Sequence, residues 1–228
     1  MNELDLNFNL DIDFEDIDFD IFKENRYNIL KQKRTKIKNV KYKYAKEFAE
    51  EIIIDKNSRY YTFIDGSFIT GDFIEAFLVG HQKRAKITLS TLSMSLENVD
   101  SFANLINAGY ISELNIIVSD YFFSHERNNL IRYMYEVLDI NDVFQLSVCR
   151  THTKITLLEY EDKKVVISGS ANLRSSDNLE QISIEENEDL YNFNKVVHDN
   201  IIKEYKTIDK SIKTKRLWQV VQKKEAEE

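Results

Sequence analysis

A histidine and a lysine stand two residues apart in the C-terminal half of the chain. His152 and Lys154 precede the sequence Ile155-Thr156-Leu157-Leu158, whose β-branched and apolar residues predict a strand. Alternate side chains of a strand share a face, so His152 and Lys154 are expected to project together. A neutral imidazole is a nucleophile and an ammonium group binds anionic oxygen, so the pair is suited to attack on a phosphate ester.

Small and polar residues follow after a predicted turn. Beyond the polar sequence Glu161-Asp162-Lys163-Lys164, the run Val165-Val166-Ile167 predicts a returning strand, which delivers Gly169-Ser170-Ala171-Asn172. Small residues at this point let the backbone and two short polar side chains approach a ligand closely. Ser170 and Asn172 can then add hydrogen-bond donors for the charge that develops during phosphoryl transfer.

Together these residues resemble the signature of the phospholipase D superfamily, which is His-x-Lys, an acidic residue, Gly-Ser with a nearby Asn, and a downstream glutamate. The matching positions are His152, Lys154, Gly169, Ser170, Asn172 and Glu180. Several elements in the expected order are far more specific than an isolated His-x-Lys. The family's acid is an aspartate, and Glu159 takes its place here. The resemblance implies a mainly structural role for this acid.

The resemblance implies a phosphodiesterase that forms a covalent phosphohistidine without a metal or another cofactor. His152 is the candidate nucleophile, and Lys154, Ser170 and Asn172 are the candidate phosphate-binding residues. Glu180 matches the family's carboxylate that holds the imidazole and fixes its tautomer. One cysteine with scattered histidines gives no zinc-binding spacing.

A second acid must protonate the leaving oxygen, which calls for a second histidine on the far side of the phosphorus. The family meets this need with two motif copies, either in one chain or across a homodimer. His81, His125 and His198 have no lysine two positions later, and we expect them at helix ends or on the surface. The sequence therefore predicts a homodimer that brings two His152 side chains together.

The composition restricts where such a protein would work. The 228 residues carry a formal net charge of −8, which argues against a uniformly basic nucleic-acid coat. The single cysteine, Cys149, excludes an intrachain disulfide and is typical of a reducing compartment, so we expect a cytoplasmic protein. The acidic N-terminus and the absence of a long apolar run predict neither a signal peptide nor a membrane span.

Charge divides the chain into four expected segments: an acidic arm over 1–22, a basic segment over 23–57, a phospholipase D-like domain over 58–206 and a basic helical extension over 207–228. The arm contains uncompensated like charges and is expected to be disordered or partner-bound. The basic segment has interleaved tyrosines, which suits either nucleic-acid binding or a solvated helix or loop. The extension either packs on the domain or grips a partner.

Strands and helices are expected to alternate in the first half of the domain. Strands are predicted at 59–64, 86–92, 114–118 and 144–149, and helices from about residues 72, 97, 124 and 188. Alternation predicts parallel strand pairs, while the strand-rich stretch 144–184 predicts antiparallel additions. The expected class is α/β with a mixed sheet, and the resemblance implies the phospholipase D-like α-β-α sandwich.

The favoured function is a nuclease, with DNA ahead of RNA, because of the basic, tyrosine-containing segment and the absence of a membrane-binding apolar helix. A second hypothesis is a catalytically silent protein that keeps the fold for binding or assembly, such as a viral or mobile-element component. A third is a lipid phosphodiesterase, which would require an apolar cleft.

Overall fold

The computed structural model describes residues 36–41, 45–64, 70–174 and 178–210. The acidic arm over 1–22 lies outside these residues. So do residues 23–35 of the basic segment and residues 211–228 of the C-terminal extension.

One eight-stranded sheet organises the described part of the chain, in the order β1-β2-β8-β7-β6-β3-β4-β5. The strands are β1 (Lys36–Lys41), β2 (Ser58–Ile64), β3 (Ala85–Thr91), β4 (Ile111–Ser119), β5 (Phe144–Cys149), β6 (Ile155–Tyr160), β7 (Lys163–Gly169) and β8 (Glu180–Glu186). The pairs β1–β2, β3–β4 and β4–β5 are parallel, and the remaining pairs are antiparallel. The predicted mixed sheet of an α/β fold is confirmed.

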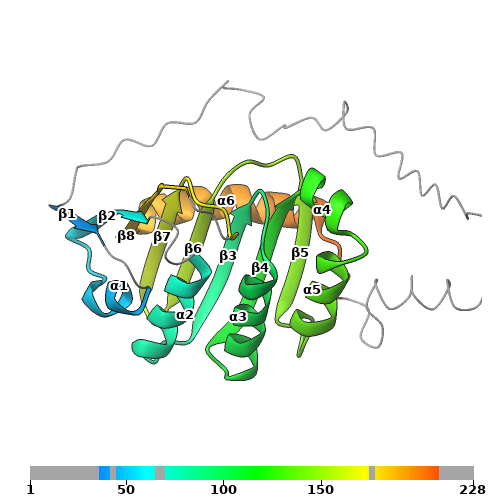
Figure 1. Cartoon of the computed structure of the whole chain (residues 1–228), viewed down its shortest axis with the longest axis horizontal. Helices are drawn as coiled ribbons and strands as arrows, with labels where there is room; N and C mark the ends of the chain where they lie inside the picture. The colour runs from blue at the N-terminus through cyan, green and yellow to red at the C-terminus, as the bar shows by residue number, and fades with distance from the viewer. Residues whose placement is uncertain (1–35, 42–44, 65–69, 175–177, 211–228) are drawn as a thin grey trace, which may run out of the picture. The chain divides into compact units, whose positions relative to one another are not determined.

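Helices cover both faces of this sheet (Figure 1). They are α1 (Ala45–Glu51), α2 (Thr70–Gly80), α3 (Leu96–Asn107), α4 (Asp120–Glu126), α5 (Leu130–Leu138) and α6 (Glu188–Tyr205). The long helix α6 packs along one face, against β3 to β7, while α2, α3 and α5 lie side by side on the other. Among the described helices, none combines the length and the apolar character needed to cross a bilayer.

The two faces differ in chemistry. Apolar side chains of α2, α3 and α5 recur at helical spacing and are buried against the sheet face that these three helices cover. The α6 face has only a small apolar cluster, centred on Leu157, Val166 and Tyr191. Burial of apolar area on the first face is thus the main source of stability.

The site-forming ends of the strands lie at one edge of the sheet. Because β6 and β8 run opposite to the other six strands, they begin where β2, β3, β4, β5 and β7 end. We call this the carboxyl edge. Loops at such an edge lie close together in space although they are far apart in sequence. Ligands of open α/β sheets bind at this edge.

The domain begins earlier and ends later than the expected 58–206. β1 pairs with β2, and α1 buries Phe48 and Ala49, so residues before 58 belong to the domain. The lysines of β1, in the sequence Lys-Ile-Lys-Asn-Val-Lys, favour a solvated charge run, but lysines are also typical of an edge strand. At the other end, Ile208 is fully buried and its N–H donates to Oε1 of Gln145 at 3.0 Å.

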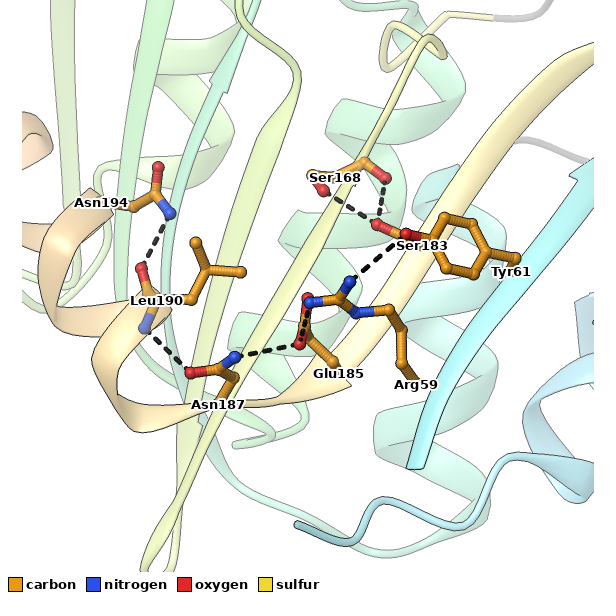
Figure 2. Close-up of polar contacts among 8 residues, drawn as sticks. All are labelled: Arg59, Tyr61, Ser168, Ser183, Glu185, Asn187, Leu190 and Asn194. Atoms are coloured by element: carbon orange, nitrogen blue, oxygen red, sulfur yellow. Dashed lines mark hydrogen bonds and ion pairs between the residues drawn. The ribbon is translucent and has the colours of Figure 1, made fainter. Parts of the chain in front are cut away.

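A polar network ties β8 to β2 and to the start of α6 (Figure 2). Arg59 donates through Nη2 to Glu185 at 2.6 Å, and Glu185 also accepts from Nδ2 of Asn187 at 3.0 Å. Asn187 in turn accepts the N–H of Leu190 at 3.0 Å through its side chain, and is therefore the N-cap of α6. The network fixes the strand whose first residue is Glu180.

Candidate active site

The His-x-Lys segment lies in a connection rather than in a strand. The chain leaves β5 at Cys149, crosses the carboxyl edge and enters β6 at Ile155 (Figure 1). The prediction that His152 and Lys154 share a strand face is therefore wrong, because the ladder between β3 and β6 ends at the pair Ser90 and Ile155. We call residues 151–154 the catalytic loop, after the role that the sequence predicts for His152.

The imidazole and the ammonium group nevertheless meet within this loop. Nζ of Lys154 donates to Nδ1 of His152 at 2.8 Å and to its carbonyl oxygen at 2.8 Å. His152 is exposed and Lys154 is half-buried. Burial lowers the pKa of Lys154, and the nearby carboxylate of Glu180 opposes this shift.

The second half of the motif closes on the first through the ends of β7 and β8. The N–H of Gly169 donates to the carbonyl oxygen of Lys154 at 3.3 Å. Ser170 donates through its hydroxyl to the carboxylate of Glu180 and accepts the N–H of Gln181 at 3.0 Å. A Cβ on Gly169 would overlap the carbonyl oxygen of Gln181, so this position requires glycine. The structure therefore brings Lys154, Gly169, Ser170 and Glu180 together.

Glu180 and Asn172 make no contact within the described part of the chain that corresponds to their predicted roles. Glu180 accepts from Ser170, and no hydrogen bond among the described residues joins it to His152. Asn172 is half-buried, and its Oδ1 has no hydrogen-bond partner within the described part of the chain. Their roles toward His152 and toward phosphate stay predictions.

Glu159 lies near the opposite end of β6 from the catalytic loop. It forms ion pairs with Lys164 of β7 at 2.8 Å and with Lys86 of β3 at 3.6 Å. The hydroxyl of Tyr191 in α6 donates to it at 3.2 Å. The hydrogen bond from Lys164 is the main cause that lowers the pKa of Glu159. The carboxylate thus joins β6 to both neighbouring strands and to α6.

His198 is not on the surface, which corrects our expectation. It is only 3% exposed, and its Nε2 lies 3.0 Å from the hydroxyl oxygen of Ser90 in β3. His198 follows the buried Tyr191 by seven residues, a spacing that places both on one helix face and that the sequence could have revealed. His81 follows the last residue of α2 and donates through Nε2 to the carbonyl oxygen of Ala49, and His125 is exposed in α4.

A small pocket lies beside Lys154. Its lining comes from the ends of β3, β6, β7 and β8 and the start of α2, and consists of Thr70, Ser90, Thr91, Lys154, Ile155, Thr156, Ile167, Ser168, Gly169, Ala171, Leu173 and Ile182. Hydroxyl groups and one ammonium group thus meet apolar side chains there. Across the ranges that the structure describes, no three His, Cys, Asp or Glu residues are grouped to hold a metal ion.

No family model matches the sequence, and no curated protein sequence matches it. Solved structures do. The chain is similar to NucT from Helicobacter pylori, with a TM-score of 0.46 and 12% identity over 64% of this chain and 96% of that one. It is also similar to Nuc, a phospholipase D family member from Salmonella typhimurium, with a TM-score of 0.40 and 13% identity over 53% of this chain and 79% of that one.

A third similar structure is polyphosphate kinase from Porphyromonas gingivalis, with a TM-score of 0.38 and 14% identity over 55% of this chain but only 19% of that one. These similarities concern the fold alone.

Proposed function

We propose that this protein is a metal-independent phosphodiesterase that uses His152 as its nucleophile, acts as a homodimer and cleaves nucleic acid in the cytoplasm, with DNA as the preferred substrate. One observation carries the proposal. Hydrogen bonds at the carboxyl edge join the two halves of the motif, from His152 through Lys154 and Gly169 to Ser170 and Glu180.

The contact between Lys154 and His152 suggests how a phosphate would start the reaction. An ammonium group only donates, so Nδ1 of His152 accepts, and the proton of the neutral ring is on Nε2. A phosphate oxygen is a charged and therefore stronger acceptor, and it would take the Lys154 ammonium in place of Nδ1. Exchange with water can then move the ring proton from Nε2 to Nδ1. The Glu180 carboxylate can accept a hydrogen bond from the Nδ1–H group and so keep the proton on Nδ1. Nε2 is left with the lone pair needed for attack.

The covalent steps follow from this arrangement. Nε2 of His152 forms a bond to phosphorus while the bond from phosphorus to the leaving oxygen breaks, and an acid gives that oxygen a proton. Water then attacks the phosphohistidine and gives its proton to the group that acted as the acid, which is now a base, and the bond from phosphorus to Nε2 breaks to release the phosphate monoester and the imidazole. Lys154 and the Ser170 hydroxyl stabilise charge on the nonbridging oxygens in both steps.

We assign the acid to His152 of a second copy, and the surface around the carboxyl edge supports this assignment. Four large apolar side chains next to the strand ends are at least half exposed: Phe63 at 53%, Leu96 at 50%, Tyr121 at 65% and Leu179 at 66%. Exposed apolar side chains distributed along one edge of a sheet can contribute to an interaction surface. A two-fold axis through this edge would set the two catalytic loops face to face.

The choice of nucleic acid rests on charge. The basic segment over 23–57 includes β1, whose lysines lie at the edge of the sheet. Lysines in such a segment can bind successive phosphates along a backbone.

The test is hydrolysis of bis(p-nitrophenyl) phosphate and of plasmid DNA in excess chelator, with the oligomeric state recorded by light scattering. The wild type is compared with His152→Ala and with His81→Gln, a matched control in which the donor to Ala49 is kept. We expect chelator-resistant cleavage by a dimer, lost in His152→Ala and kept in His81→Gln. Cleavage that persists in His152→Ala would refute the proposal.

A silent binding or assembly protein is the second candidate. It is favoured by Glu180, whose carboxylate is engaged by Ser170, and by Glu159 in place of the family's aspartate. A well-folded wild type that binds DNA in a gel-shift assay but cleaves neither substrate would establish this candidate instead.

A further inference from the structure

A buried imidazole lies behind the catalytic loop, and the mechanism above does not use it. His198 projects from α6 toward the sheet and is 3% exposed. Its Nδ1 lies 2.7 Å from the carbonyl oxygen of Asn194, and its Nε2 lies 3.0 Å from Oγ of Ser90. Most polar groups on a helix contact solvent, whereas this ring is buried. Burying an imidazole costs free energy unless both of its nitrogens form hydrogen bonds.

The hydrogen bonds of this ring have one consistent direction. A carbonyl oxygen can only accept, so Nδ1 of His198 carries a proton. Burial lowers the pKa of His198, so the ring is neutral and Nε2 is an acceptor. The Ser90 hydroxyl must therefore donate to Nε2, and its oxygen is left as an acceptor on the side of the catalytic loop.

Thr153 uses that acceptor. Its Oγ1 donates to Oγ of Ser90 at 2.8 Å, although Thr153 is otherwise exposed. Thr151 extends the chain, because its Oγ1 lies 2.8 Å from Oγ1 of Thr153 and accepts the N–H of Thr153 at 3.2 Å. The hydroxyl and imidazole groups thus form a line from the core to the loop.

Thr153 stands between the two residues that the proposed function needs most. We infer that His198 and Ser90 form a positioning system, which anchors Thr153 so that His152 and Lys154 on either side are presented to the substrate phosphate. The inference rests on the proposed function, and it assigns to the core of the α6 face a role in orienting the loop. Well-oriented reacting groups lower the activation barrier. Loosening this anchor is therefore expected to lower kcat while changing KM little.

The first test measures kcat and KM for bis(p-nitrophenyl) phosphate in Thr153→Val, which keeps the shape and removes the hydroxyl, and in Ser90→Ala. We expect kcat to fall about tenfold in each, with KM within about twofold of the wild-type value. Thr153→Ser retains a hydroxyl and should retain most of kcat. The double variant Thr153→Val with Ser90→Ala should lose no more than either single variant, because both break one line of bonds.

Thr88 supplies the matched control. It lies on β3 two residues before Ser90, is 4% exposed and accepts from Nδ2 of Asn115 at 3.4 Å. Thr88→Val should lower the melting temperature yet leave kcat unchanged. The inference is overturned if Thr153→Val keeps the wild-type kcat, if the two substitutions act additively, or if Thr88→Val lowers kcat as much as Ser90→Ala.

A second measurement separates this inference from the proposed function. Nitrogen-15 NMR of the imidazole should find the proton of His198 on Nδ1, and hydrogen exchange at the Thr153 amide should speed up in Ser90→Ala but not in Thr88→Val. A wild type with these signals but no hydrolysis overturns the proposed function while the anchored loop stands. A proton on Nε2, or unchanged exchange in Ser90→Ala, overturns the inference itself.

Discussion

Gly169→Ala tests how closely the two halves of the candidate site must approach. A Cβ at this position would overlap the carbonyl oxygen of Gln181 and lie 3.0 Å from its carbonyl carbon and from Cα of Ile182. All three atoms belong to the backbone of β8, which cannot rotate away as a side chain could. Strand β8 must therefore move away from β7 at the point where it supplies Glu180.

The size of the effect follows from the required movement. Nonbonded carbon atoms sit best about 3.5–4.0 Å apart, so β8 must retreat by roughly 1 Å next to Gly169. Overpacking of this kind costs about 1–3 kcal/mol. For a protein of this size we expect the melting temperature to fall by about 2–12 °C. A displacement of about 1 Å at reacting groups can also lower kcat by about 100-fold.

The assay compares Gly169→Ala with Gly80→Ala in thermal unfolding and in hydrolysis of bis(p-nitrophenyl) phosphate. Gly80 ends α2, and a Cβ there meets no atom within 4 Å, so alanine should be neutral or slightly stabilising. If Gly169→Ala matches Gly80→Ala in melting temperature and in kcat, the close approach of β7 to Gln181 is not needed and the reasoning fails.

Four further substitutions and reactions test other contacts. Glu185→Ala leaves the Arg59 guanidinium, 23% exposed, without its carboxylate and should cost about 2–3 kcal/mol in urea unfolding, whereas replacing both by Met should restore most of the loss. Burial lowers the pKa of His198 below its ordinary 6.5, so the unfolded state binds more protons. Its contribution is complete above pH 6.5 and is lost as the pH falls toward the lowered value, so the free energy of unfolding should drop more steeply there than in His198→Gln. Glu159→Gln should cost about 1 kcal/mol at low salt and less in 1 M NaCl, because its ion pairs are partly exposed. Burial raises the pKa of Cys149 to about 11, so iodoacetamide should alkylate the thiol only as fast as the protein unfolds. Mass spectrometry measures this rate, and rapid alkylation of the native protein would contradict the expectation.

Much of the fold could be predicted because burial leaves periodic marks in a sequence. The helical spacing of apolar residues in α2, α3 and α5 indicated the face that packs on the sheet, and the structure confirms it. Strand β1 could not be predicted, because its lysines suggest a solvated charge run. Its pairing depends on β2, which lies beyond α1 in the sequence. The sequence predicts one helix from about residue 124, whereas the structure has α4 followed by α5, because the seven residues of α4 carry too little periodicity to mark it separately.

The site was predictable in its residue types and less so in its geometry. Spacing could say that His152 and Lys154 act together, but it could not distinguish a strand from a loop, because β6 begins only where β3 offers a partner. His198 was missed because a histidine in a helix is usually solvated. Its burial follows from Ser90 and Thr153, which lie far away in sequence and supply the hydrogen bonds that make burial tolerable.

Strand direction explains why a motif spread over residues 152–180 converges at one edge. If β6 or β8 ran parallel to its neighbours, Lys154 and Glu180 would lie at opposite edges of the sheet. Direction alone does not suffice, since register must also bring Gly169 against the carbonyl of Lys154. The two-residue turn between Tyr160 and Lys163 sets this register in the β6–β7 hairpin. A slip of one residue would set Ser168 against that carbonyl and turn each side chain of β7 to the other face, so the shortest turn in the sheet controls the geometry of the site.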